Sequence, residues 1–141
     1  MKRLVLDTDV VVAGMRSPRG ASAALLRAAR EQTVTVLASL PLALEYEAVC
    51  TLYEHRRAAG LTVEEGRVFL DAVLAMVEPV EIYFLWRPQL HDPDDEMVLE
   101  AAINGRAEAI VTFNLSDYGV VPERFGIKVL RPAEALRRIR Q

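Results

Sequence analysis

The stretch RLVLDTDVV, residues 3–11, carries the strongest fold signal in this chain. An apolar run, LVL, stops at Asp7, and a second acid, Asp9, follows two residues later. Short aliphatic and β-branched runs that end at a polar residue are typical of buried strands. The stretch therefore predicts a first strand over 3–6 that is closed by Asp7.

Working outward from it, short strand patterns alternate with longer helical patterns. The further predicted strands are 34–38, 80–86 (VEIYFLW), 107–113 (AEAIVTF) and 127–130 (IKVL). After the turn-rich RSPRG, the predicted helices are 21–30, 39–60 with Ser39 as cap, 62–77 with a Thr62 and Glu65 capping box, 97–105 and 132–141. This alternation predicts an α/β fold, a three-layer α/β/α sandwich around a central, mainly parallel sheet, in a single domain over 1–141.

Composition excludes several classes of protein. The chain has 141 residues, of which 52% are hydrophobic, and a net charge of −3, which argues against a surface that clamps nucleic acid as a whole. No apolar run reaches the ~20 residues that cross a bilayer, and the single cysteine, Cys50, has no partner for an internal disulfide. We therefore expect a cytoplasmic protein that does not enter a membrane. No CxxC pair, phosphate-binding glycine loop or serine-nucleophile motif is present.

Acidic residues from four segments fall where a parallel sheet gathers functional groups, beyond the carboxyl ends of its strands. They are Asp7 and Asp9 after the first strand, Glu45 and Glu47 early in the second helix, Asp92, Asp94, Asp95 and Glu96 at a helix start, and Asp117 after AIVTF. Carboxylates held together repel one another unless their pKa values rise or a cation lies between them. Mg²⁺ or Mn²⁺ suits such oxygen ligands and would activate a water for attack on a phosphodiester.

Each acid also has a purely structural interpretation. Asp9 either shares the metal or holds the turn through local hydrogen bonds. Glu45 and Glu47 lie two residues apart on a helix, so at most one of them points to the site. Asp92 before Pro93 has the pattern of a helix N-cap, and Asp95 fits the reciprocal acid of a capping box. Similarly, Asp117 binds either metal or water, or only caps its turn with the neighbouring serine.

Four blocks of the sequence resemble the PIN-domain family, and within it the toxin-like members found beside antitoxins. The blocks are VLDTDVVVAG (5–14), ASLPLALEYEAV (38–49), DPDDEMVLEAA (92–102) and IVTFNLSDY (110–118). Their order and their positions on strands and helices match the family over nearly the whole chain. The resemblance implies a Mg²⁺- or Mn²⁺-dependent endoribonuclease, an RNA substrate, a homodimer and a small antitoxin that blocks the site.

The resemblance also assigns roles to residues. Asp7, Glu45, Asp95 and Asp117 are the implied catalytic residues, and Asp7 and Asp95 are the implied metal ligands. Glu45 would help to bind the metal or orient the attacking water. The implied supporting residues are Thr112, Asn114, Asp9 and Asp92. Two of these positions depart from the family's usual pattern, since Asp9 stands where Asn is common and Asn114 where Asp is frequent.

Two other functions fit parts of the pattern. An apolar strand followed by DTDVV also resembles a haloacid-dehalogenase-type phosphatase, with Asp7 as nucleophile and Asp9 as acid and base. That enzyme needs a lysine before its last acidic motif, and Lys2 and Lys128, the two lysines of this chain, lie outside the acidic series. The second is a catalytically weak PIN-like module that only binds RNA or regulates.

Overall fold

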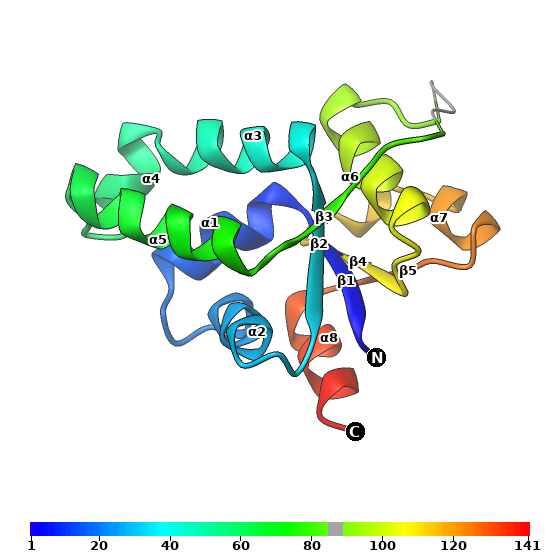
Figure 1. Ribbon diagram of the computed structural model, residues 1–141, viewed down its shortest axis with the longest axis horizontal. Coiled ribbons are helices and arrows are strands. Elements are labelled where there is room, and N and C mark those ends of the chain that lie inside the picture. The colour runs from blue at the N-terminus through cyan, green and yellow to red at the C-terminus, as the bar shows by residue number, and fades with distance from the viewer. Residues whose placement is uncertain (85–88) are drawn as a thin grey trace.

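The fold is seen in a computed structural model that describes residues 1–84 and 89–141 (Figure 1). Its strands are β1 (Arg3–Leu6), β2 (Thr35–Ser39), β3 (Glu78–Val80), β4 (Ala109–Val111) and β5 (Lys128–Leu130). Its helices are α1 (Thr8–Arg16), α2 (Ala21–Arg30), α3 (Leu40–Cys50), α4 (Tyr53–Ala58), α5 (Val63–Met76), α6 (Pro93–Asn104), η1 (Leu115–Asp117), α7 (Val121–Arg124) and α8 (Pro132–Ile139), of which η1 is a 3₁₀ turn.

The described strands form one parallel sheet in the order β3-β2-β1-β4-β5. The chain builds outward from β1 through β2 to β3, then returns to the other side of β1 for β4 and β5. The point at which this direction reverses lies between β1 and β4, whose register pairs Leu6 with Val111. In open parallel sheets, ligands bind beyond the carboxyl ends of the strands at such a switch point.

Helices cover both faces of the sheet. Figure 1 shows α1 and α2 on one side and α6 on the other, with α8 beside α2. The central strand is accordingly apolar throughout, and Leu4, Val5 and Leu6 are 0% exposed. This arrangement confirms the predicted α/β/α sandwich, with a fully parallel sheet. None of the helices in the described ranges combines the length and the apolar character needed to span a bilayer.

Several local predictions are confirmed. Strand β1 and helix α2 have the predicted bounds. Ser39 caps α3 by accepting a hydrogen bond from the Leu42 amide at 3.3 Å, and Thr62 and Glu65 form the reciprocal capping box of α5. Asp92 caps α6 with Pro93 as its first residue, so α6 starts four residues before the predicted Met97.

Helix α1 was not predicted. Its run of three valines, residues 10–12, favours strand locally because β-branched side chains lose rotamer freedom in a helix. The structure overrides that preference: Asp7 caps the helix by accepting from the Thr8 amide at 2.8 Å, and Val10 and Val11 are fully buried. The short elements η1 and α7 were also missed.

The single helix predicted over 39–60 is wrong, because the chain breaks between α3 and α4. The Thr51 hydroxyl donates to the carbonyl oxygens of Glu47 at 2.7 Å and Ala48 at 3.3 Å. Such bonding competes with the helical ladder at its end. Leu52 is then extended, with φ −61° and ψ 135°, and α4 starts in a new direction.

The strand predicted over 80–86 is displaced, since β3 ends at Val80. Residues 83–84 are instead bound by the side chain of Asn104 at the end of α6. Asn104 Oδ1 accepts from the amides of Tyr83 and Phe84, and Asn104 Nδ2 donates to the Phe84 carbonyl oxygen, each at 3.0 Å. The last two residues of the predicted strand, 85 and 86, lie outside the described residues.

Candidate active site

Asp7 lies at the switch point between β1 and β4, one residue beyond the end of β1. Its amide donates to the Val111 carbonyl oxygen at 2.9 Å, which holds its backbone against β4. Its Oδ1 accepts from the Thr8 amide at 2.8 Å. Its Oδ2 accepts from Thr112 Oγ1 at 2.8 Å and from the Tyr118 hydroxyl at 3.0 Å. Both carboxylate oxygens of Asp7 are therefore oriented by fixed donors.

Asp9 lies in the first turn of α1 and fastens the loop that follows β4. Its Oδ2 accepts from the Phe113 amide and from Asn114 Nδ2, each at 3.1 Å. Its Oδ1 is buried and has no hydrogen-bond partner within residues 1–84 and 89–141. Burial, followed by the charge of Asp7, raises the pKa of Asp9 to about 6. The partners of Oδ2 are 104 and 105 residues away in the sequence, so these are not the local turn hydrogen bonds that the structural interpretation expected. A buried oxygen without a partner, such as Oδ1, is uncommon in a folded protein.

Thr112 connects the two parts of this network. It is 0% exposed, and its Oγ1 donates to Asp7 while accepting from the Asn114 amide at 3.0 Å. Asn114 in turn contacts Asp9, so the loop after β4 is tied to both acids that follow β1. The predicted supporting residues Thr112 and Asn114 accordingly lie at the site.

Asp95, in the first turn of α6, faces this group from another segment and is 9% exposed. Burial, then the charges of Asp7, Asp92, Asp117 and Asp94, raises its pKa from 3.8 to about 7. Asp92 caps the helix through the Asp94 amide at 2.9 Å. No hydrogen bond reaches the Asp95 carboxyl from the part of the chain that the structure describes, which disfavours its predicted capping-box role.

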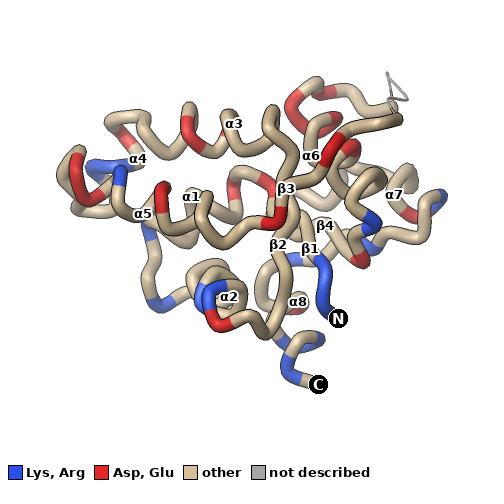
Figure 2. The backbone as a smooth tube through the Cα atoms, in the orientation of Figure 1, with Lys and Arg blue, Asp and Glu red and all other residues tan. Residues whose placement is uncertain are grey.

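Glu45 approaches the same region from α3. It lines a pocket of about 610 Å³ together with Asp7 and Asp94. Burial, then the charges of Asp94, Asp92 and Asp7, raises the pKa of Glu45 above its usual value. Figure 2 shows that the acidic positions of α3 and of the start of α6 lie above the upper end of the sheet. Glu45 is therefore close enough for its carboxylate to interact with the charges of Asp7, Asp92 and Asp94.

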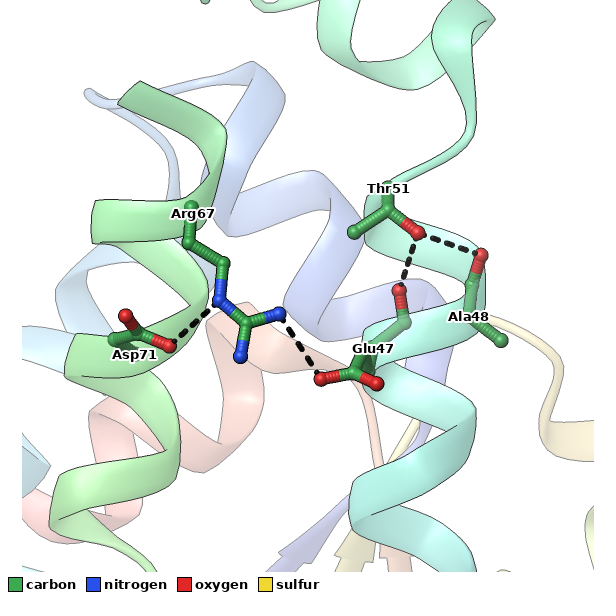
Figure 3. A network of polar contacts seen from close by, with 5 residues as sticks. All are labelled: Glu47, Ala48, Thr51, Arg67 and Asp71. Atoms are coloured by element: carbon green, nitrogen blue, oxygen red, sulfur yellow. Dashed lines mark hydrogen bonds and ion pairs between the residues drawn. The ribbon is translucent and has the colours of Figure 1, made fainter. Parts of the chain in front are cut away.

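Glu47 points away from the site, toward α5. Its Oε2 accepts from Arg67 Nη1 at 3.0 Å, and Arg67 Nε also pairs with Asp71 at 3.1 Å (Figure 3). Both ion pairs are exposed; the first joins α3 to α5, and the second lies within α5. The expectation that at most one of Glu45 and Glu47 points to the site is confirmed, and Glu45 is that residue.

The donor set fits a hard divalent cation. Within the described ranges, no group of three His, Cys, Asp or Glu side chains is close enough to hold an ion by itself. Mg²⁺ needs only one or two protein carboxylates, because it keeps several of its waters. A cation at this site would offset the repulsion between the carboxylates. Two features indicate where it would act: Asp9 Oδ1 is buried without a partner within the described ranges, and the pKa of Asp95 is raised.

Two buried tyrosines belong to the site and were not predicted. Tyr118, 0% exposed, donates to Asp7 Oδ2, and Tyr46, also 0% exposed, donates to the Leu6 carbonyl oxygen. Burial, followed by the charge of Asp7, raises the pKa of both phenols, so they remain neutral donors. The sequence signal for Tyr118 was its place directly after Asp117.

Comparison with known proteins agrees with this geometry. The family model of the PIN domain matches residues 3–116, which include β1 to β4, Asp7, Asp9, Glu45 and Asp95, and the match ends one residue before Asp117. No curated protein matches the chain. PIN domains are generally nucleases and typically use divalent metal ions. With a match over most of its length and an acidic site at the switch point of a parallel sheet, this chain belongs to the PIN-domain family.

Proposed function

We propose that this PIN domain is a Mg²⁺- or Mn²⁺-dependent endoribonuclease that hydrolyses phosphodiester bonds in RNA. The observation that carries the proposal is the position of Asp95, which is 9% exposed and lies in the field of Asp7, so that burial first and the charge of Asp7 second raise its pKa to about 7. An enzyme fold that keeps several buried carboxylates in one place is stabilised by a cation there. A substrate phosphate is the ligand that such a cation most readily shares with a protein.

In this proposal Asp7 and Asp95 hold the metal, and Glu45 assists in binding it or orients the attacking water. Asp117 and Asn114 complete the site through water or hydrogen bonds, and Asp117 acts as the fourth catalytic acid. A bound divalent cation would neutralise charge on the phosphate oxygens and lower the pKa of a bound water.

The remaining steps belong to the protein's own groups. Thr112 and Tyr118 fix the Asp7 carboxylate, so that it need not reorganise when the substrate binds. The raised pKa of Glu45 makes its carboxylate a stronger proton acceptor than an ordinary glutamate, which suits the role of orienting and deprotonating a water. The hydrogen bonds that Asp9 accepts from Phe113 and Asn114 hold the loop carrying Asn114 beside Asp7.

Cleavage of a labelled single-stranded RNA by the purified protein tests the proposal. Activity should require Mg²⁺ or Mn²⁺, stop with a chelator, and disappear in Asp7→Asn and Asp95→Asn. Equal cleavage by wild type and both variants would identify a contaminating nuclease and contradict the mechanism. Metal-dependent RNA binding without cleavage would instead favour a module that only binds RNA.

The phosphatase alternative is disfavoured by the position of the lysines. Lys128 starts β5 and pairs in register with Ala109, while the Lys2 amide donates to Glu108. Both lysines thus lie at the amino ends of parallel strands, and Asp7 lies beyond the carboxyl end of β1. Hydrolysis of a small phosphate monoester with a trapped phospho-Asp7 would reverse this conclusion.

We further propose that the chain is the toxin of a toxin–antitoxin pair, acting in the cytoplasm as a homodimer. The family resemblance supports this role, and the exposed apolar side chains Leu40 and Leu44, 71% and 55% exposed on α3, offer a surface for a second copy. Expression of the wild-type chain should arrest growth, whereas Asp7→Asn should not. A short neighbouring reading frame that relieves the arrest would identify the antitoxin, and the mass in solution would give the oligomeric state.

A further inference from the structure

The pocket beside Asp7 has two chemically different ends. One end is acidic and contains Asp7, Asp9, Glu45 and Asp94. At the other end the lining residues include Arg16, the last residue of α1, and His55 of α4. Figure 2 shows basic positions in α4, on the opposite side of the molecule from the acidic start of α6. A single groove thus has acidic side chains at one end and Arg16 and His55 at the other.

Helix α1 sets the separation of the two ends. Asp9 and Arg16 are seven residues apart, close to two helical turns, so they lie on the same side of α1. A rise of 1.5 Å per residue separates them by about 10 Å along the helix axis. Val12 and Ala13 line the pocket between them. The groove therefore follows the axis of α1 away from the switch point.

Arg16 and His55 form a pair of hydrogen-bond donors. Arg16 Nη1 lies 3.4 Å from His55 Nδ1, and since a guanidinium only donates, Nδ1 is the acceptor in this contact. The imidazole then carries its hydrogen on Nε2. Arg3, Arg67 and Arg138 each pair with a carboxylate, but Arg16 has no such pair within residues 1–84 and 89–141. Its exposed guanidinium keeps donors for an anion.

We propose that Arg16 and His55 form a phosphate subsite, which binds a backbone phosphate of the substrate strand next to the phosphodiester held at Asp7 and Asp95. This inference rests on the proposed nuclease function and extends it. A strand that enters an acidic pocket in a protein of net charge −3 is repelled unless local donors compensate. Arginine donates to two phosphate oxygens at once, and an imidazole N–H adds a third donor.

The subsite defines the class of substrate. A small phosphate monoester or a dinucleotide with one phosphodiester fills only the acidic end of the groove. A strand with a further phosphate reaches both ends. We therefore expect the protein to prefer oligonucleotides over dinucleotides, through contacts to the backbone that carry no base specificity.

Binding of a fluorescein-labelled single-stranded RNA to the whole chain, followed by fluorescence anisotropy in a chelator, tests the subsite without catalysis. Arg16→Gln should weaken binding about fivefold to tenfold and reduce the slope of log K against log salt concentration by about 0.7, as for one lost phosphate contact to a single strand. His55→Gln should weaken binding less. The matched control is Arg137→Gln, an exposed arginine on α8, beside α2, which should bind as wild type does.

Kinetics provide the second readout. The wild-type kcat/KM for the longer strand should exceed that for a dinucleotide. This preference should fall about fivefold in Arg16→Gln and stay at the wild-type value in Arg137→Gln. Equal affinity and equal salt slope in the two variants would overturn the subsite, as would a wild-type protein that binds no RNA. A wild-type protein that cleaves nothing, with binding still lost in Arg16→Gln, would contradict the nuclease proposal and leave the subsite supported. A deoxyribonucleotide strand of the same sequence tells whether the subsite requires RNA.

Discussion

Tyr118 donates its hydroxyl hydrogen to Asp7 Oδ2 across 3.0 Å, from a position with no solvent exposure. A donor behind a metal-binding carboxylate fixes its orientation, and losing such a donor commonly weakens metal affinity by about 10- to 100-fold. Tyr118→Phe keeps the ring and removes only this donor. We expect Mn²⁺ affinity, measured by calorimetry, to fall by about tenfold and RNA cleavage to fall with it.

Tyr83→Phe is the matched control, because Tyr83 is 75% exposed and its hydroxyl contacts only Glu81 among the described residues. It should leave both Mn²⁺ affinity and cleavage unchanged. If Tyr118→Phe bound Mn²⁺ as tightly as wild type does, the hydroxyl would have no role in orienting the metal ligand.

This contact also shows where sequence reasoning about the site ends. Asp7 could be found because it closes an apolar strand, and Asp95 because it follows a helix cap in an acidic block. The contact of Tyr118 with Asp7 depends on η1, which brings the chain back to the end of β1 over a separation of 111 residues. No local pattern encodes that return, because it is produced by tertiary packing.

Thr112 gives a prediction about stability. Its hydroxyl bridges Asp7 Oδ2 and the Asn114 amide inside a fully buried position. Thr112→Val keeps the shape and removes both hydrogen bonds, so the free energy of unfolding in urea should fall by about 1–3 kcal/mol. Thr112→Ser retains the hydroxyl and should lose less than Thr112→Val. The reverse order would mean that the methyl group, rather than the hydroxyl, stabilises the site.

The fold was predicted where local and tertiary preferences agree. A few neighbouring residues are enough to predict such elements, as the capping box at Thr62 and Glu65 and the apolar run of β1 show. Helix α1 was missed because three successive valines favour a strand locally, while burial of Val10 and Val11 favours the helix. The break after Thr51 was missed for a similar reason, since the helical pattern continues in the sequence through His55.

The two glutamates of α3 offer a paired test of the proposed catalytic role. Glu45 lines the pocket beside Asp7, whereas Glu47 pairs with Arg67 on the outside. A positioned acid or base typically contributes about 10²- to 10⁴-fold to rate, so Glu45→Gln should reduce kcat by about 10²-fold or more. Glu47→Gln should retain kcat and lose at most about 1 kcal/mol of stability. Similar kcat values in the two variants would remove Glu45 from the mechanism.

The raised pKa of Asp95 predicts how the metal-free protein responds to pH. The folded protein keeps this proton up to about pH 7, whereas an unfolded chain releases it near 3.8. The folded state therefore binds more protons between these values, and the free energy of unfolding without metal should fall as pH rises from about 4 to 7. Asp95→Asn should flatten that fall.

The stabilisation by metal should show the opposite trend and increase with pH, because a bound cation displaces the proton from Asp95. Asp9, whose pKa is about 6, is protonated in only a fraction of the molecules near that pH and would lose its proton as well. The increase in Tm caused by saturating Mg²⁺ should therefore be larger at about pH 8 than at about pH 6. In Asp95→Asn the increase should be small at both values. An increase in Tm that does not change with pH would contradict the proposed ligand.

The most direct test of the central claim is a Mg²⁺ titration of RNA cleavage by wild type and Asp95→Asn, purified side by side from metal-free preparations. We expect no cleavage without metal, a saturable rise in rate for wild type, and a rate at least about 10²-fold lower for Asp95→Asn at every Mg²⁺ concentration. Cleavage by wild type that is independent of Mg²⁺ and Mn²⁺, or equal titration curves for the two proteins, would contradict it.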